Sequence, residues 1–371
     1  NEPVTPATRF GIASLSKAFT AAAVARLVQE DALAWDDKAR DHLDYFALHD
    51  PWVSSQVSLR DLLCHRVGLA TFDGDLLWYG THYSREEVLR RIQHLPLKQD
   101  FRAEFGYSNL MYMAAGEVIL HPTGMTWDDY IQGEFFRPLG MLSTTTINDR
   151  TERDDVALPH LSGKRINPLN YDSMGAAASI NASISDMTKW ARMLLGGGVF
   201  EGDTILQPET VQELFRINTP LKPNSMEGMV GTNFKGYGLG WFVRDYAGHK
   251  VVGHGGGLPG YISKITLMPE EDLGIILLTN DMKYLTGLEF WLLDRFLRPD
   301  AQEDWAPLYL GWVQDGDRRD STRRAARKAA RHPTSRPSLA DTAYTGTYRD
   351  TMYGPARIYT NAQDSLVLEL T

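Results

Sequence analysis

The sequence contains a single cysteine, Cys64, among its 371 residues, and it has no long hydrophobic run. One cysteine excludes an intramolecular disulfide framework and says little about the redox compartment. Cys64 lies in the apolar helical pattern LRDLLCHRVGL, so we expect it to be a buried small hydrophobic residue. No window of 18 consecutive apolar residues occurs, so the sequence predicts no membrane span.

Metal ligands and cofactor motifs are also scarce. None of the ten histidines belongs to an H-E-x-x-H pattern, and no two of them lie four residues apart. The sequence therefore predicts neither a metal site nor a cofactor. Residues 255–260 match the pattern G-x-G-x-x-G, but they include Pro259 and run directly into the strand-like YISKITL. A dinucleotide-binding turn needs a helix at that point, so we reject this interpretation.

Positive charge is concentrated in one segment of an acidic chain. The formal net charge is −9, whereas residues 318–336 contain eight Lys or Arg and one Asp, a net +7. The rest of the chain therefore carries a net −16, the difference between these values. This balance disfavours nucleic acid as a partner, and no aromatic residues interleave with the arginines. We interpret the segment as a solvated helix and linker; nucleic-acid binding would instead be salt-sensitive and lost on its deletion.

Helical patterns dominate the first two hundred residues, and strand patterns follow. Apolar residues at helical spacing predict helices over residues 14–31, 58–69, 109–124, 126–141 and 183–198. After residue 236, β-rich runs predict an antiparallel hairpin of residues 261–268 and 274–279, and a helix near residues 287–297 follows. Helices and strands in separate blocks indicate an α+β fold rather than regular βαβ alternation.

Composition divides the chain into three parts. Residues 1–316 form the main domain, and residues 317–338 form a basic linker that contains prolines. Residues 339–371 have the strand patterns of a separate small β domain, of which they supply only a part. No internal repeat is visible.

The stretch FGIASLSKAFT places Ser14 and Lys17 three residues apart at the start of the first predicted helix. Side chains at this spacing share one helix face, one turn apart. Burial and the helix dipole both favour the neutral amine of a lysine there, which can accept the serine proton. The free N–H groups of the helix start can also bind an oxyanion. Chance alone gives about half an S-x-x-K in such a chain, so an accidental pair is the alternative.

A second candidate is the pair Tyr107 and Asn109 in FGYSNLMYM, just before a predicted helix. A phenol there can relay protons to and from a serine–lysine pair, and the Asn109 amide can hold a substrate carbonyl. The alternative is a buried tyrosine beside an asparagine that caps the helix. The same spacing recurs at Tyr359 and Asn361 in the small β unit, where we regard it as accidental.

The third candidate is His254 with the glycines that follow it in VVGHGGGLPGYISKITL. Glycines at the end of a strand let a substrate backbone approach closely and offer it N–H groups. His254 lies at the start of that edge, where its side chain would direct a polar group into an adjacent cleft. An ordinary His–Gly turn is the alternative.

In this order, the three motifs resemble the set found in serine β-lactamases and penicillin-binding proteins. With Tyr-x-Asn in the middle, the chain is similar to the branch of class C β-lactamases, D-alanyl-D-alanine carboxypeptidases and family VIII esterases, and most of all to CubicO-like serine hydrolases. The resemblance covers most of residues 4–280. It implies an antiparallel sheet flanked by helices, a mostly helical second lobe and the start of a small C-terminal β domain.

The resemblance implies a catalytic role for four residues. Ser14 would attack the substrate carbonyl and form an acyl-enzyme. Lys17 and Tyr107 would share the general acid and base work, and which of them holds the proton stays open. His254 stands where other members have lysine, and it is cationic only when its pKa allows. This departure disfavours β-lactams and carboxylate-ended peptides as the best substrates.

The same resemblance implies the groups that bind the substrate. Asn109 would orient the substrate amide or ester, and Gly255 and Gly256 would line it. The backbone N–H groups of Ser14 and Gly257 would form the oxyanion hole.

The two ends of the sequence depart from the family pattern. Only 13 residues precede Ser14, where the family has a helix and strands that pair beside the strand at residues 274–279. We therefore expect an incomplete chain of low solubility in which residues 274–279 form an exposed sheet edge. We also expect the C-terminal β unit to be incomplete.

These inferences combine into a cofactor-free serine hydrolase that acts on a small ester, amide or D-amino-acid-containing peptide. The alternative is a catalytically silent relative that serves as a binding or assembly module, which the intact set of motif residues disfavours. The sequence does not choose among esterase, peptidase and β-lactamase, nor between a monomer and a homo-oligomer. The resemblance favours a periplasmic or secreted protein.

Overall fold

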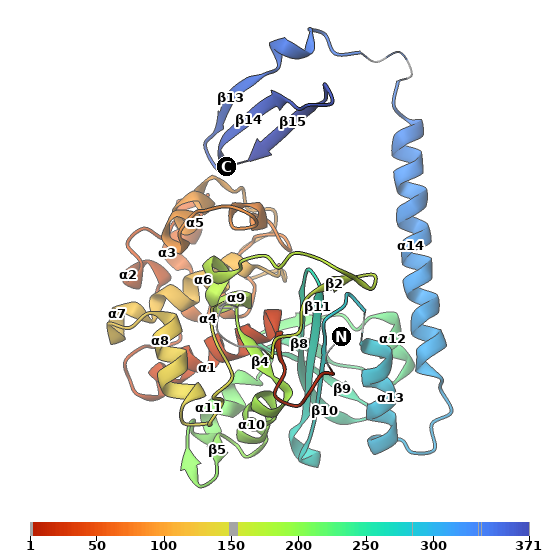
Figure 1. The fold of residues 1–371 in the computed structure, drawn as a ribbon. Coiled ribbons are helices and arrows are strands. Elements are labelled where there is room, and N and C mark those ends of the chain that lie inside the picture. Colours follow the sequence, from red (N-terminus) through yellow and green to blue (C-terminus); the bar gives the residue numbers. More distant parts are fainter. Residues whose placement is uncertain (1–2, 148–154, 284, 333, 335, 371) are drawn as a thin grey trace. The chain divides into compact units, whose positions relative to one another are not determined.

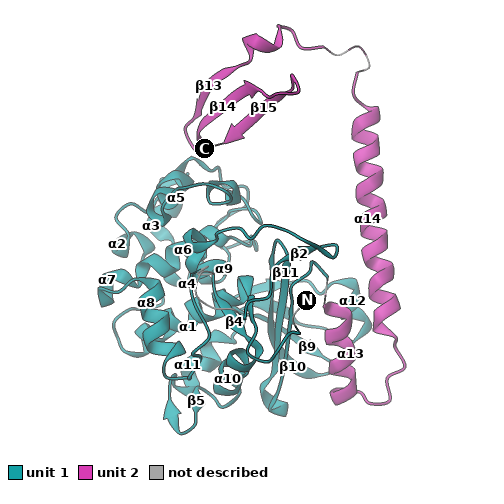
Figure 2. Cartoon of the chain, viewed as in Figure 1, with its two compact units in different colours: residues 1–283 teal, residues 284–371 magenta. Residues whose placement is uncertain are grey.

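The computed structural model describes residues 3–147, 155–283, 285–332, 334 and 336–370. The chain forms two compact units, Asn1–Lys283 and Tyr284–Thr371, which are coloured separately in Figure 2. This division differs from the predicted boundary at residue 316, because helix α14 (Trp305–Ala329) runs through that position without a break. The predicted linker is therefore helical as far as Ala329, and the three-part division stays a prediction.

A six-stranded antiparallel sheet forms the frame of the first unit (Figure 1). Its strand order is β12-β11-β10-β9-β8-β7. The strands are β7 (Thr219–Leu221), β8 (Lys235–Tyr237), β9 (Phe242–Tyr246), β10 (His249–Leu258), β11 (Tyr261–Met268) and β12 (Leu273–Thr279). The predicted hairpin of residues 261–268 and 274–279 is confirmed by the pairing of β11 with β12. The predicted α+β class is also confirmed.

Strand β12 lies at the edge of this sheet, as the sequence predicted for residues 274–279. Within the described part of the chain, β12 pairs with β11 and with no other strand. Its sequence LGIILLT is almost wholly apolar, and most of its residues are only half-buried. An apolar edge strand of this kind is prone to pair with other chains.

A helical lobe lies beside the sheet in Figure 1. Its main helices are α1 (Ser16–Gln29), α4 (Leu59–Leu63), α5 (Arg85–Arg91), α6 (Asn109–Val118), α8 (Trp127–Ile131) and α9 (Gly175–Ala178). Helices α10 (Ile184–Leu195) and α11 (Pro208–Leu214) complete the first unit's longer helices. The Oγ of Ser183 accepts a hydrogen bond from the Asp186 N–H and caps α10, as the predicted start of that helix required.

Helix α1 is buried on almost every side rather than along one stripe. All residues from Ser16 to Ala25 are buried, although the sequence predicted an amphipathic helix here. The helix packs against α6, α8, α9 and α11 at once. Its run of alanines lets these neighbours approach closely, because alanine adds little side-chain bulk. The consequence for function is that Lys17 lies in the protein interior.

Three predicted helices are shortened or divided in the structure. The helix predicted over residues 58–69 ends at Leu63, because His65 adopts a left-handed backbone conformation with φ of 60°. The helix predicted over residues 126–141 is α8 followed by a π-helical turn that ends at Phe136. The helix predicted over residues 109–124 divides into α6 and a short α7 (Leu120–Thr123).

The second unit contains helix α13 (Thr286–Leu297), helix α14 and a three-stranded antiparallel sheet. The sheet consists of β13 (Gly346–Asp350), β14 (Gly354–Thr360) and β15 (Leu366–Leu370), so the predicted strands of the C-terminal β unit are confirmed. Trp305 anchors α14 against α13, where its Nε1 donates to Asp294 Oδ2 at 2.6 Å.

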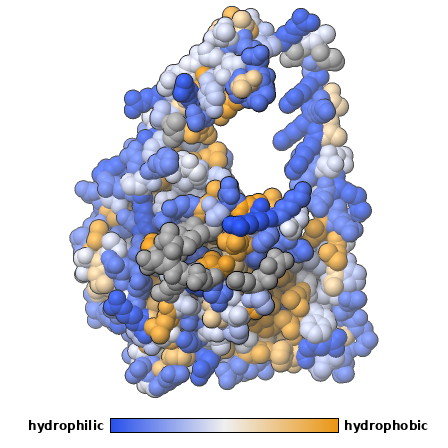
Figure 3. Space-filling view, in the orientation of Figure 1, coloured by the Kyte–Doolittle hydropathy of each residue, from blue (hydrophilic) through white to orange (hydrophobic). Residues whose placement is uncertain are grey.

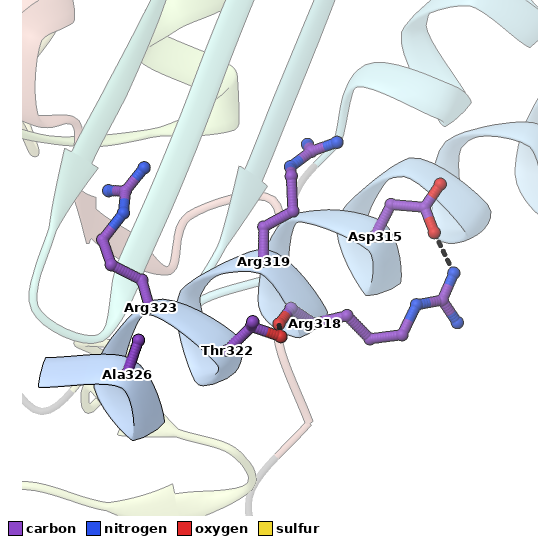
Figure 4. Close-up of a pocket in the computed structure, with 6 residues that line it drawn as sticks. All are labelled: Asp315, Arg318, Arg319, Thr322, Arg323 and Ala326. Atoms are coloured by element: carbon purple, nitrogen blue, oxygen red, sulfur yellow. Dashed lines mark hydrogen bonds and ion pairs between the residues drawn. The ribbon is translucent and has the colours of Figure 1, made fainter. Parts of the chain in front are cut away.

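The surface along α14 is largely hydrophilic (Figure 3), which agrees with the predicted solvated helix. A shallow groove on this helix is lined by Asp315, Arg318, Arg319, Thr322, Arg323 and Ala326. Figure 4 shows Arg319 and Arg323 extending from the same side of the helix, while Arg318 pairs with Asp315. All six residues belong to one exposed helix, so this groove is not the reaction site.

Candidate active site

Ser14 lies on a tight turn between a strand and the buried helix α1. The turn is the 3-10 segment η1 (Ala13–Leu15), which follows strand β1 (Arg9–Gly11). Ala13 has a φ of 51°, a left-handed conformation that costs free energy for a residue with a Cβ. Ala13 and Leu15 are buried, whereas the Ser14 side chain is partly exposed. The strained turn thus leaves the serine partly exposed between two buried neighbours.

Lys17 is fully buried directly behind Ser14. Its Nζ lies 3.2 Å from Ser14 Oγ, 2.7 Å from Asn109 Oδ1 and 2.9 Å from the Ala177 carbonyl oxygen. Burial lowers the pKa of Lys17 to about 7, and the negative charge of Asp75 partly opposes this shift. At neutral pH a substantial fraction of this lysine is therefore an uncharged amine.

The three partners of Nζ are not equivalent. The Asn109 Oδ1 and the Ala177 carbonyl oxygen are acceptors without a proton to give, so each must face an N–H of Lys17. The Ser14 hydroxyl is the one partner of the three that can donate. When Lys17 is neutral, its lone pair therefore points toward the Ser14 proton. This arrangement suits a general base for Ser14.

Tyr107 belongs to the same cluster. Its side chain lies near Ser14, and the Lys17 Nζ lies 4.8 Å from the centre of its ring. Burial raises the pKa of Tyr107 well above its usual value, more than its interaction with Ser14 lowers it. The phenol therefore keeps its proton at neutral pH, and it can act as a proton donor.

Asn109 is held from both ends of its amide. It is the first residue of α6, whose cap is the Oγ of Ser108. Its Oδ1 accepts from Lys17, and its Nδ2 donates to Asp75 Oδ2 at 2.9 Å. Nδ2 has a second proton to donate, and its use by a substrate carbonyl stays a prediction. The carboxylate of Asp75 therefore determines which way the Asn109 amide faces.

His254 is neutral and is enclosed by the protein. Its Nδ1 lies 2.7 Å from the Gly255 carbonyl oxygen, and its Nε2 lies 3.0 Å from the Tyr237 hydroxyl. The first contact requires a proton on Nδ1, so Nε2 accepts from Tyr237. Burial, followed by the charge of Lys17, lowers the pKa of His254 to about 3. From the sequence, the charge of His254 depended on an unknown pKa. The low pKa in the structure means that this side chain is uncharged at neutral pH.

The glycine-rich end of β10 lies beside the serine turn. Strand β9 pairs with β10 only as far as Gly253, so residues 254–258 are bonded on one side, to β11. A Cβ at Gly256 would lie 2.3 Å from Ser263 Oγ and 2.5 Å from the Ile12 carbonyl oxygen. Gly255 and Gly257 are exposed. The roles of these glycines in binding substrate, and that of the Gly257 N–H in an oxyanion hole, stay predictions.

We expect Gly256→Ala to lower kcat/KM by about 10- to 100-fold, because it displaces the turn that carries Ser14. The Ser263 hydroxyl that the new methyl group would strike donates to the Ile12 carbonyl oxygen at 2.6 Å and so supports this turn. Steady-state kinetics with an activated ester measures the effect. Gly274→Ala in β12 is the control, since its nearest atoms would lie at 3.4 Å. Equal kinetics for the two variants would contradict the prediction.

A buried cluster around His65, beside Tyr107, was not predicted from the sequence. His65 Nδ1 accepts from the Ser108 backbone N–H at 3.1 Å, and the His65 ring lies 4.4 Å from the Tyr107 ring. Tyr112 and Tyr237 pack on the same imidazole at 5.1 and 4.7 Å. In LRDLLCHRVGL, Cys64 is buried as predicted. The adjacent His65 is the only residue of this motif that could have indicated the cluster.

Asp75 was also missed, because nothing in GDLLW marks it as part of a site. It follows Gly74, whose φ is 81°, in the 3-10 turn η2 (Asp75–Leu77).

In the described part of the chain, no cluster of His, Cys, Asp or Glu is arranged to hold a metal ion. No helix there is long and apolar enough to cross a membrane.

Comparison with known proteins identifies the family. The family model described as Beta-lactamase matches residues 1–291. This chain belongs to the beta-lactamase family. The resemblance inferred from the three motifs is confirmed, and with it membership of a superfamily of serine hydrolases and amidases.

Two relatives illustrate the range of the family. The chain is 27% identical over 395 residues to "Unguisins hydrolase ungD'" of Aspergillus campestris, which covers 99% of this chain and 71% of that protein. It is 28% identical over 290 residues to "Penicillin-binding protein 4" of Amycolatopsis lactamdurans, covering 75% and 73% of the two chains.

Solved structures share the fold. The octameric penicillin-binding protein homologue from Pyrococcus abyssi has a TM-score of 0.68 at 24% identity, over 80% of this chain and 67% of that one. The D-amino acid amidase from Ochrobactrum anthropi SV3 has a TM-score of 0.65 at 24% identity, over 80% and 94%. This architecture therefore occurs in proteins with amidase and penicillin-binding names.

Proposed function

We propose that this family member is an acyl-transferring hydrolase that uses Ser14 as its nucleophile. Its substrate would be a small ester, an amide or a D-amino-acid-containing peptide. The observation that carries the proposal is the position of the Lys17 amine, 3.2 Å from the serine hydroxyl and held by two carbonyl acceptors. The names of the relatives, an unguisins hydrolase and a D-amino acid amidase, favour amide bonds.

The reaction would begin with the neutral form of Lys17. The amine takes the Ser14 proton as Oγ attacks the carbonyl carbon, and the backbone N–H groups of Ser14 and Gly257 stabilise the oxyanion. Tyr107 donates its proton to the leaving amine or alcohol as the carbon–heteroatom bond breaks, and the Lys17 ammonium then reprotonates Tyr107. A water molecule attacks the acyl-enzyme by the same route, which restores Ser14 and releases the acid.

The function is tested by intact mass after exposure to a fluorophosphonate probe. We expect a single adduct on the wild-type protein and none on Ser14→Ala, because a fluorophosphonate reacts much faster with an activated serine than with ordinary hydroxyl groups. Ser185→Ala is the matched control, since Ser185 is exposed on helix α10 and outside the reacting cluster, and it should give the wild-type adduct.

Substrate panels follow on unlabelled protein, because the adduct blocks Ser14. Esters of p-nitrophenol, D-alanyl peptides and a chromogenic cephalosporin distinguish esterase, peptidase and β-lactamase activity. The absence of an adduct on folded wild-type protein would contradict the proposal. It would favour the alternative of a catalytically silent protein that uses this cleft to bind a ligand.

A further inference from the structure

A carboxylate that no catalytic step uses lies at the edge of the reacting cluster. Asp75 is partly exposed, and its two oxygens accept from Trp78 Nε1 at 3.0 Å and from Asn109 Nδ2 at 2.9 Å. Both donors are uncharged groups. They orient the carboxylate but leave its negative charge in place.

The charge balance of the site changes when it becomes ready to react. Burial raises the pKa of Asp75, and the charge of a protonated Lys17 on the other side of the Asn109 amide opposes that shift. The reactive form has lost the Lys17 proton, so Asp75 then loses this compensating charge. Uncompensated charge in a partly buried site is costly. A cation in the cleft would restore the balance.

His254 and Lys264 do not supply that cation. His254 is neutral, and both of its ring nitrogens contact protein groups. Lys264 pairs with Gly255 in the sheet, whereas Gly256 pairs with Ser263. Because paired residues share a face, and Gly256 faces the serine turn, the Lys264 side chain leaves from the opposite face.

We propose that Asp75 binds an ammonium group of the substrate, adjacent to the carbonyl that Ser14 attacks. This inference rests on the proposed function and narrows it to substrates with a free α-amine, such as amino-acid amides, amino-acid esters or peptides at their amino end. An α-ammonium lies two bonds from the carbonyl carbon. Three hydrogen bonds connect Asp75 to Ser14 through Asn109 and Lys17, so the carboxylate and the nucleophile belong to one hydrogen-bonded chain.

The same turn offers an apolar surface for the substrate side chain. Phe72, Leu76 and Tyr79 are 57%, 56% and 45% exposed, which is unusual for large apolar residues that lie so close together in sequence. The Phe72 ring lies 5.5 Å from that of Tyr107, so it borders the reacting cluster. We therefore expect an apolar side chain on the residue that bears the ammonium.

The test compares two substrates that differ only in charge. Phenylalanine p-nitroanilide carries a free amine with a pKa of about 8, and its N-acetyl derivative is neutral. Both are measured at pH 7, as D and as L enantiomers. We expect wild-type protein to favour the free amine by about 10- to 100-fold in kcat/KM, as is typical for a charge-assisted hydrogen bond in a partly buried site. Asp75→Asn should remove this preference.

Asp73→Asn is the matched control. Asp73 lies in the same turn and pairs with the exposed Lys98 at 3.0 Å, so this variant should keep the wild-type preference. If Asp75→Asn lowers both rates equally, Asp75 only positions Asn109, and the subsite is refuted. Failure to cleave either free-amine substrate by protein that forms the Ser14 adduct also refutes it. Loss of the adduct itself would instead overturn the proposed function.

Discussion

Replacing Lys17 by arginine is expected to lower kcat/KM at pH 7.5 by about 10³-fold. Arginine keeps the positive charge and the hydrogen-bond donors, but its guanidinium stays protonated and cannot accept the Ser14 proton. General base catalysis contributes roughly 10²- to 10⁴-fold in enzymes. Steady-state rates with a p-nitrophenyl ester measure the loss. Lys222→Arg, at an exposed position, should have wild-type rates.

The pH profile of the wild-type protein belongs to the same prediction. Because Lys17 must lose its proton to act as the base, and its pKa is about 7, kcat/KM should rise with pH through that value and level off above it. His254 contributes no limb between pH 5 and 8, since its pKa is about 3. The residual activity of Lys17→Arg should lack the rise near pH 7. A rise that persists in this variant would assign the base to another group.

Replacing Tyr107 by phenylalanine is expected to lower kcat/KM for an anilide by about 10²-fold or more. The burial that raises the pKa of Tyr107 keeps its phenol protonated, so its contribution is to donate a proton to the leaving group. An amine must be protonated before it leaves, whereas p-nitrophenolate leaves without help. We therefore expect a much smaller loss for the p-nitrophenyl ester than for the anilide.

The chain supplies its own control for this experiment. Tyr359 and Asn361 repeat the Tyr-x-Asn spacing in the C-terminal β unit, where Tyr359 belongs to strand β14. Tyr359→Phe should leave both rates unchanged. Equal losses for the ester and the anilide in Tyr107→Phe would mean that Tyr107 acts in the attack of Ser14 and not in departure of the leaving group.

Where the pattern of neighbouring residues was enough to define a helix or strand, the structure has that element at the predicted place. Helix α10 begins after its serine cap, and the hairpin of β11 and β12 lies where two β-rich runs predicted it. The helix predicted over residues 58–69 ended early for a reason outside its own sequence. His65 turns to contact Tyr107 and Ser108, which are more than forty residues away.

In the candidate site, too, the residues within each motif were predicted from the sequence, whereas contacts between distant residues were not. The structure brings Ser14, Lys17, Tyr107 and Asn109 into one cluster, in which hydrogen bonds join Lys17 to Ser14 and Asn109. The motif-based prediction left open which group holds the proton, because that depends on burial. Asp75 was not predicted, since its bond to Asn109 crosses 34 residues and no pattern marks it.

The sequence by itself determined the short-range chemistry of this protein. Ser14 and Lys17 share a helix face because three residues make nearly one helical turn, and the glycines of β10 leave a strand edge without side chains. Only the tertiary structure decided the charge of each group. Packing around α1 buries Lys17 and brings its pKa near 7, and Tyr237 and Lys17 surround a neutral His254. Desolvation and pair interactions depend on what lies nearby in space, which neighbours in sequence do not specify.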